Sequence, residues 1–176
     1  AALISHLRVF GRNPAEKPAE FSIDDAVRGG LSLIGMKIKD DGIMLKVGDL
    51  TKLPFIKGHM ILYEQVVLNL LSNARESILS KRVSCGDSRV GSDSINISGT
   101  ENESGVVLTV TDSGAGISDK IIKRLFQPFA TTKDVGQGTG LGLYIAYGII
   151  ADMGGTISAS NVPGGAEFSV VVPRAD

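Results

Sequence analysis

The sequence predicts an α+β domain, in which helices occur together with antiparallel pairs of strands. Apolar residues recur at helical spacing over residues 58–80 and again over 141–153. Residues 95–111 and 156–172 instead contain alternating apolar and polar residues interrupted by glycine-containing turns, which is the pattern of a β-hairpin. With 176 residues, of which 43% are hydrophobic, the chain is long enough to form one domain with its own core.

The amino-terminal part of the chain predicts two helices separated by a linker. Residues 3–12 have apolar side chains on one side and predict the end of a helix, and a short proline-containing linker follows at 14–18. Ser22 with Asp25 three residues later is a capping-box pattern, which predicts a helix that continues to about Lys39.

A strand over residues 43–47 precedes the helix predicted at 58–80, and this helix has an unusual polar face. The polar residues lie at helical spacing: Gln65, Asn69, Ser72, Asn73 and Glu76. The opposite arc is apolar: Val66, Val67, Leu70, Leu71, Ala74 and Ile78. Asparagine is a poor helix former, so a bound polar group and an ordinary solvated face are both compatible with this stripe.

The remaining elements follow from local patterns. Residues 81–93 are rich in Ser, Gly, Asp and basic residues, which predicts a loop with little function. After the first hairpin, Ser118 predicts the start of a short helix that reaches about Leu125. A loop is expected from Gln127 to about Thr139, before the helix at 141–153 and the last hairpin.

Composition excludes several classes of function. Eighteen Lys and Arg residues balance nineteen Asp and Glu residues, so the chain has no extended positive surface for a nucleic acid. One Cys and two His residues fit neither a disulfide scaffold nor a structural zinc site. The apolar runs are too short for a membrane helix, and the first residues resemble no signal peptide. We therefore expect a cytoplasmic fragment of a larger protein, with no direct membrane contact.

Glycine is concentrated between residues 114 and 165, in two motifs. The first is Asp112-Ser113-Gly114-Ala115-Gly116, which by itself is as typical of a turn as of a binding loop. The second is Gly136-Gln137-Gly138-Thr139-Gly140-Leu141-Gly142-Leu143, directly before a helix, where free backbone N–H groups favour phosphate oxygens. No Gly-Lys pair of a phosphate loop occurs, and the glycine spacing gives little support for dinucleotide binding.

The order of four motifs resembles the N, G1, F and G2 boxes of sensor histidine kinases. They are Asn69-Leu-Leu-Ser-Asn-Ala74, Asp112-Ser-Gly-Ala-Gly-Ile117, Leu125-Phe-Gln-Pro-Phe-Ala-Thr-Thr-Lys133 and Gly138-Thr-Gly-Leu-Gly-Leu143. The resemblance covers residues 21–173 and implies the Bergerat ATP-binding fold: a two-layer α/β sandwich with a mixed, mostly antiparallel sheet and helices on one face. It divides the chain into a remnant of a dimerisation helix at 1–12, a linker at 13–19 and a catalytic domain at 20–176.

The same resemblance implies roles for individual residues. Asn73, with Asn69 beside it, would bind Mg²⁺ and take part in catalysis. Asp112 would accept a hydrogen bond from the adenine amine of ATP, with Gly114, Gly116 and Ile117 next to the base. Phe126 and Phe129 would anchor a lid. The phosphates would lie near the following residues: Thr132, Lys133, Gly138, Thr139, Gly140, Leu141 and Gly142.

The implied reaction is transfer of the γ-phosphoryl group of ATP to a histidine on a dimerisation domain, with a response regulator as indirect partner. Related ATPases have a Glu as base where this chain has Asn69, so hydrolysis is expected to be slow. Neither His6 nor His59 has the surroundings of an acceptor. A nucleotide-sensing pseudokinase and a slow ATP hydrolase remain the alternatives. The chain departs from the family pattern at three positions: Ser113, Ala130 and Ala166.

Overall fold

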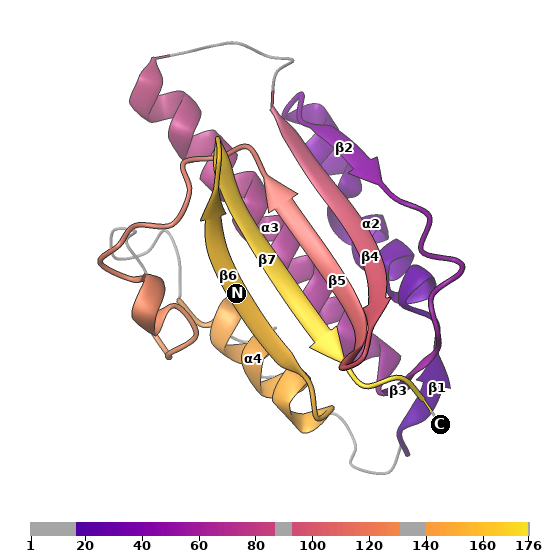
Figure 1. Ribbon diagram of the computed structural model, residues 1–176. Helices are drawn as coiled ribbons and strands as arrows, with labels where there is room; N and C mark the ends of the chain where they lie inside the picture. The colour runs from indigo at the N-terminus through magenta and orange to yellow at the C-terminus, as the bar shows by residue number, and fades with distance from the viewer. Residues whose placement is uncertain (1–16, 87–92, 131–139, 176) are drawn as a thin grey trace.

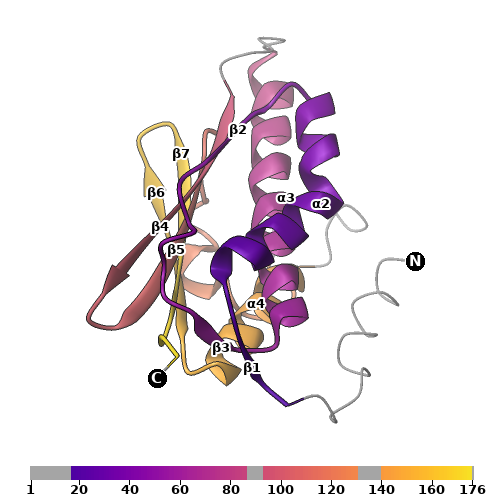
Figure 2. The same cartoon turned by 90° about the vertical axis from the view of Figure 1, so that its right-hand side faces the viewer.

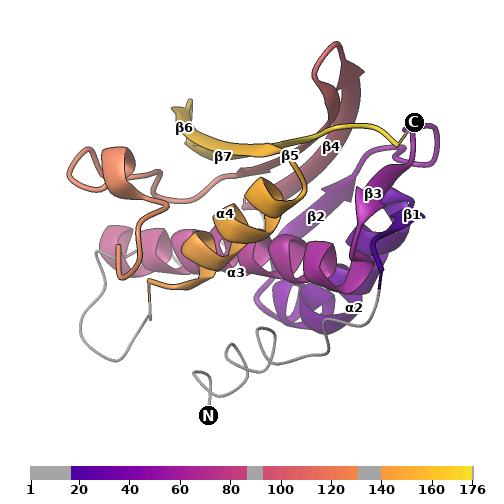
Figure 3. The ribbon, with the colours of Figure 1, turned by 90° about the horizontal axis from the view of Figure 1, so that it is seen from below.

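A computed structural model describes residues 17–86, 93–130 and 140–175, and these residues form two layers. A five-stranded sheet makes one layer, and three helices cover one of its faces: α2 (Ile23–Asp40), α3 (Met60–Cys85) and α4 (Gly142–Asp152). Figures 1 and 2 show the helices on one side of the sheet, and in Figure 3 α3 runs between α2 and α4. The predicted α+β class and two-layer arrangement are confirmed.

The sheet is mixed but mostly antiparallel. Its strands follow the order β2 (Met44–Val47), β4 (Ser94–Asn102), β5 (Gly105–Asp112), β7 (Gly165–Val172) and β6 (Thr156–Val162). Only the pair formed by β2 and β4 is parallel, and both predicted hairpins occur, as β4–β5 and β6–β7. Strand β5 therefore lies in the middle of the sheet, and its last residue, Asp112, is opposite Ile95 on one side and Ala166 on the other.

Alternation along the central strands explains why the helices pack on one face. Val106, Leu108 and Val110 of β5 are buried, whereas Thr109 and Thr111, which point to the opposite face, are only partly covered. Because successive side chains of a strand point to opposite faces, one face of β5 meets the helices and the other meets solvent.

Helix α2 begins as the sequence predicts and contains two adjacent glycines for a steric reason. The Ser22 side chain accepts a hydrogen bond from the Asp24 N–H at 3.1 Å and so caps the helix. At Gly30, a Cβ atom would lie 2.8 Å from Cγ1 of Val67 on α3. The glycine therefore allows the close approach of α2 and α3 at this point, which offsets its low helix propensity.

Helix α3 is longer than predicted. All six residues of its predicted apolar arc are buried, and the helix extends to Cys85 before Gly86 takes a left-handed conformation with φ of 60°. The expectation of a loop from residue 81 is therefore wrong for 81–85, where Lys81 and Arg82 have partners on the sheet side. Of the residues predicted to be a loop, 87–92 lie outside the described ones.

The short helix predicted after Ser118 is only a 3-10 turn, η1 (Ile122–Arg124), because Leu125 is the single buried apolar residue nearby. Strands β1 (Ala19–Phe21) and β3 (Ile56–Gly58) form a small separate sheet that the sequence patterns did not indicate.

The helix predicted at 3–12 falls outside the described residues. Among those described, no helix combines the length and the apolar character needed to cross a membrane.

Candidate functional site

One row of side chains on α3 organises the candidate site. Asn69, Asn73, Ser77 and Lys81 follow one another at intervals of four residues, which places them along the same side of the helix. Hydrogen bonds of this row reach the first residue of α4 and the segment that follows β5. Motifs that lie far apart in the sequence are therefore brought to one side of α3.

Asn69 connects α3 to α4. Its side chain is only 7% exposed, and its Nδ2 donates a hydrogen bond to the carbonyl oxygen of Gly142 at 2.9 Å. Its Oδ1 accepts a hydrogen bond from Nε2 of Gln65 at 3.1 Å. Both ends of the amide thus have protein partners, and the structure places Asn69 as a contact between two helices.

Asn73 differs from Asn69 because its side chain is half-buried and has no hydrogen-bond partner within the described part of the chain. An amide oxygen is a ligand that Mg²⁺ accepts, and Mg²⁺ is normally held by one or two protein groups together with the phosphates of the substrate. Among the described residues, no cluster of three His, Cys, Asp or Glu side chains could hold a metal ion. Asn73 therefore fits Mg²⁺ better than Asn69 does, provided that a ligand supplies further oxygens.

Asp112 is a buried carboxylate at the end of the central strand. It is 4% exposed, and its Oδ1 accepts a hydrogen bond from the Gly114 N–H at 2.8 Å. Burial raises the pKa of Asp112, while hydrogen bonds from Gly114, the Ser77 side chain and the Ala166 backbone, and the charge of Lys81, act in the opposite direction. A buried acceptor of this kind can discriminate between a ligand that offers an N–H group and one that does not.

The glycines after Asp112 are required by the packing of the loop itself. Gly116 has a φ of 75°, and a Cβ atom at Gly114 would collide with the Ser77 side chain. The N–H of Ile117 donates to Oδ1 of Asn161 at 2.6 Å, and its carbonyl accepts from Nδ2 of Asn161 at 2.8 Å. Gly114, Gly116 and Ile117 thus form one ordered loop, as both interpretations of the motif require.

The two phenylalanines of the predicted lid are placed differently. Phe126 packs against the core and stacks on Tyr147 with ring centroids 6.0 Å apart, whereas the Phe129 side chain is 73% exposed. Phe129 has a φ of 63°, and the neighbouring Gly140 leaves room for its backbone. The exposed side chain of Phe129 therefore does not anchor this segment in the structure.

The second glycine motif is described only in part. Gly140, Leu141 and Gly142 precede or begin α4, and the Leu141 carbonyl accepts the Ile145 N–H at 2.9 Å. The predicted phosphate-site residues Thr132, Lys133, Gly138 and Thr139 lie outside the described residues.

Three residues that contact the predicted site were missed: Ser77, Lys81 and Asn161. Ser77 and Lys81 continue the four-residue spacing of Asn69 and Asn73, so extending the stripe by two positions would have found them. Asn161 had no such signal, because its contact joins residues 44 positions apart.

The position of Glu64 is informative because a carboxylate could act as a base for water. A Cβ atom on Gly29 would collide with the Glu64 carboxylate, so this side chain lies against α2, away from the row that carries Asn69. Glu64 is therefore not oriented toward the candidate site.

The departures from the family pattern have local explanations. Ser113 Oγ accepts a hydrogen bond from the Ser94 N–H at 2.9 Å, which joins the loop to the start of β4. Ala166 is 2% exposed and lies directly opposite Asp112 in the β5–β7 pair. The N–H of Ala130 donates to the carbonyl of Gln127 at 3.3 Å in the segment after η1.

Comparison with known proteins identifies similar chains. A model of the family described as "Histidine kinase-, DNA gyrase B-, and HSP90-like ATPase" matches residues 58–176. The two-component sensor PprA of Pseudomonas aeruginosa is 36% identical over 175 residues, which represent 98% of this chain and 18% of PprA. The chain thus spans less than a fifth of the length of this relative.

Solved structures of histidine kinases have a fold similar to that of this chain. The nucleotide-free catalytic domain of histidine kinase ThkA has a TM-score of 0.73 and 28% identity, over 90% of this chain and 97% of that domain. A second structure, of ThkA in complex with response regulator protein TrrA, has a TM-score of 0.72 and 22% identity, over 99% of this chain and 47% of that chain.

Proposed function

Because the chain belongs to the histidine kinase-, DNA gyrase B- and HSP90-like ATPase family, we propose that it binds Mg-ATP and donates the γ-phosphoryl group to a histidine on a dimerisation domain. The observation that carries this proposal is the row on α3, which brings Asn73 and the loop of Asp112 to one side of a single helix. One end of this row suits an adenine base and the other suits phosphates and a divalent cation.

Adenine recognition is assigned to Asp112. The exocyclic amine of adenine donates a hydrogen bond, whereas guanine has a carbonyl oxygen at the equivalent position. A buried carboxylate would accept the first and repel the second, so ATP is expected to bind better than GTP. Gly114 and Gly116 would let the backbone approach the base, and the partly buried side chain of Ile117 would lie next to it.

Phosphate recognition is assigned to the opposite end of the row. Backbone N–H groups at the start of an 11-residue helix such as α4 favour anions, so Gly140, Leu141 and Gly142 are suited to the phosphates. We extend this assignment to four residues outside the described ones: Thr132, Lys133, Gly138 and Thr139. When bound, Mg²⁺ would neutralise phosphate charge, and Asn73 is the residue that would hold it.

Transfer to a histidine is favoured over hydrolysis. Asn69 carries an amide that cannot accept a proton at neutral pH, and both of its polar atoms already have partners. Phosphoryl transfer depends mainly on positioning and on charge neutralisation, so it needs no base at this position. A response regulator is proposed as the downstream partner, since ThkA, which has the same fold, was solved with TrrA.

The first experiment is calorimetric titration of the chain with ADP and with a non-hydrolysable ATP analogue, each with and without Mg²⁺. We expect saturable binding that Mg²⁺ strengthens. In Asn73→Ala the enhancement by Mg²⁺ should be lost, with weakening of about tenfold or more, while far-UV circular dichroism stays unchanged. No binding up to millimolar nucleotide would contradict the proposal, and a full Mg²⁺ effect in Asn73→Ala would contradict the metal assignment.

A further inference from the structure

We infer that Lys81 is a positioning residue for base selection: with Ser77, it fixes the loop that carries Asp112 and Gly114. The inference rests on the proposed role of Asp112 in adenine recognition. It adds to that role a reason why the loop holds its shape, and it assigns that task to two side chains at the carboxyl-terminal half of α3.

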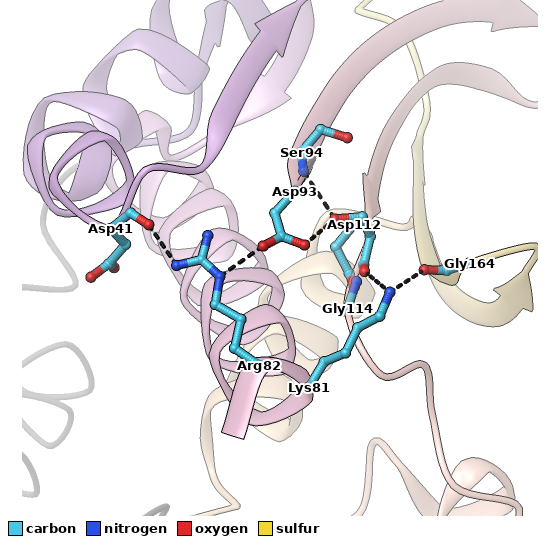
Figure 4. Close-up of polar contacts among 9 residues, drawn as sticks. Asp41, Lys81, Arg82, Asp93, Ser94, Asp112, Gly114 and Gly164 are labelled. Carbon is cyan, nitrogen blue, oxygen red and sulfur yellow. Dashed lines mark hydrogen bonds and ion pairs between the residues drawn. The ribbon is translucent and has the colours of Figure 1, made fainter. Parts of the chain in front are cut away.

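Lys81 joins three parts of the chain that are distant in sequence. Its Nζ donates a hydrogen bond to the Ser113 carbonyl at 2.6 Å and another, longer one to the Gly164 carbonyl at 3.4 Å. Figure 4 shows the side chain extending from α3 toward Gly164 and the residues after β5. The amine therefore ties the turn between β6 and β7 to the loop directly after Asp112.

Ser77 holds the same loop one helical turn earlier. Its Oγ accepts a hydrogen bond from the Ala115 N–H at 3.1 Å, and its side chain acts to lower the pKa of the nearby Asp112 carboxyl. Between these contacts, Gly114 passes so close to Ser77 that a larger residue would not fit. Residues 113 and 115 are thus each hydrogen-bonded to a side chain of the row on α3.

One side of this loop borders open space rather than packed side chains. A hollow of about 500 Å³ lies beside it, lined by Lys81, Cys85, Gly114, Gly116, Asn161 and Gly164 among others. Ala115 is exposed, and the register pairs of β5 end at Asp112, after which Ser113 bonds Ser94 of β4 through its N–H and its Oγ. Without the amine, the open space would let the loop shift, and the Gly114 N–H would no longer fix one oxygen of Asp112.

Arg82, the next residue, holds the end of α3 from the other side. Its Nε contacts Oδ2 of Asp93 at 2.7 Å, and its Nη1 donates to the Asp41 carbonyl at 2.6 Å (Figure 4). The backbone that carries Lys81 is therefore fixed relative to both the start of β4 and the end of α2. Because its backbone is held in place, Lys81 is suited to setting the position of a loop.

The test compares two nucleotides that differ in their bases, ADP and GDP, in the presence of Mg²⁺. In Lys81→Met we expect ADP affinity to fall by about tenfold, the effect of losing one charge-assisted hydrogen bond, while GDP affinity changes little. The ratio of the two affinities should therefore fall. Lys81→Arg, which keeps the charge and can donate to both carbonyls, should recover most of the ratio. Lys57→Met, which removes an exposed amine on β3, is the matched control and should leave the ratio unchanged.

The outcomes separate this inference from the proposed function. A wild-type chain that binds ADP no better than GDP would overturn the role of Asp112 itself. A clear wild-type preference that persists in Lys81→Met, or an equal loss for both nucleotides, would overturn only the role of Lys81. If Lys81→Met does not fold, Ser77→Ala decides: a reduced ADP-to-GDP ratio supports the inference, and an unchanged ratio contradicts it.

Discussion

At the scale of single residues, Asp112 shows how one buried charge links stability to recognition. Its pKa is raised by burial, despite the hydrogen bonds that it receives. A carboxyl group with a higher pKa in the folded chain binds its proton more tightly there. It therefore favours the fold below its unfolded pKa, and this contribution disappears as the pH rises through the folded pKa.

The first prediction concerns the pH dependence of stability. Asp112→Asn keeps an oxygen for the Gly114 N–H but removes the buried charge. We expect its stability relative to the wild type to increase as the pH rises above about 4, the ordinary pKa of an Asp carboxyl, because only the wild type must then ionise a buried carboxyl. Urea unfolding of both chains at several pH values measures the difference. A difference that stays constant with pH would show that Asp112 titrates normally.

Single residues also show what the sequence can reveal about the site. Asn69 and Asn73 stand out because asparagine is unfavourable within a helix. Ser77 and Lys81 continue the same spacing, but their residue types are ordinary on a helix surface, and only the structure shows that residues 113–115 and 164 fold against them. Contacts between distant segments depend on the three-dimensional path of the chain, which local patterns do not determine.

At the scale of elements, the contact between α2 and α3 depends on a close approach at Gly30. Gly30 faces Val67, whose branched side chain has little freedom to move away. Gly35 lies on the same helix, but nothing would lie within 4 Å of a Cβ atom there. The two glycines therefore form a natural pair for separating packing from helix propensity.

The second prediction uses this pair. Gly30→Ala should destabilise the chain by about 1–3 kcal/mol, because the added methyl group overpacks the interface between the helices. Gly35→Ala should stabilise it by about 0.5–1 kcal/mol, since alanine has the higher helix propensity and meets no neighbour. Chemical denaturation of both variants measures these changes. Equal effects of the two substitutions would mean that α2 and α3 do not approach as closely as described.

Periodicity predicted most elements, but not their ends. The apolar arc of α3 and both hairpins could be identified because burial of one face imposes a regular spacing. The end of α3 could not be predicted, because residues 81–85 are polar or exposed and show no apolar spacing. This last turn is stabilised by the hydrogen bonds of Lys81 and Arg82 to residues next to the sheet. Strands β1 and β3 were too short to produce a pattern, since each has three residues.

At the scale of the whole molecule, His59 is the one histidine among the described residues that could be considered as a phosphoryl acceptor. His59 precedes the first residue of α3, and its side chain makes no capping hydrogen bond. The other histidine, His6, lies outside the described residues. Relatives such as PprA are much longer than this chain, which spans only 18% of PprA. We therefore expect the acceptor histidine to belong to a separate dimerisation domain.

The third prediction follows from this division. Incubation of the chain with radiolabelled Mg-ATP should produce no acid-labile phosphohistidine, and His6→Gln should behave in the same way. Addition of a separately produced dimerisation domain from the parent protein should yield label on that domain, because the chain binds the nucleotide and the added domain supplies the nucleophile. Asn73→Ala should reduce the transfer rate by at least tenfold with no change in fold. Labelling of the chain alone that disappears in His6→Gln would instead place the acceptor within these 176 residues. Nucleotide binding without transfer to the added domain would identify the chain as a nucleotide sensor and reject the kinase assignment.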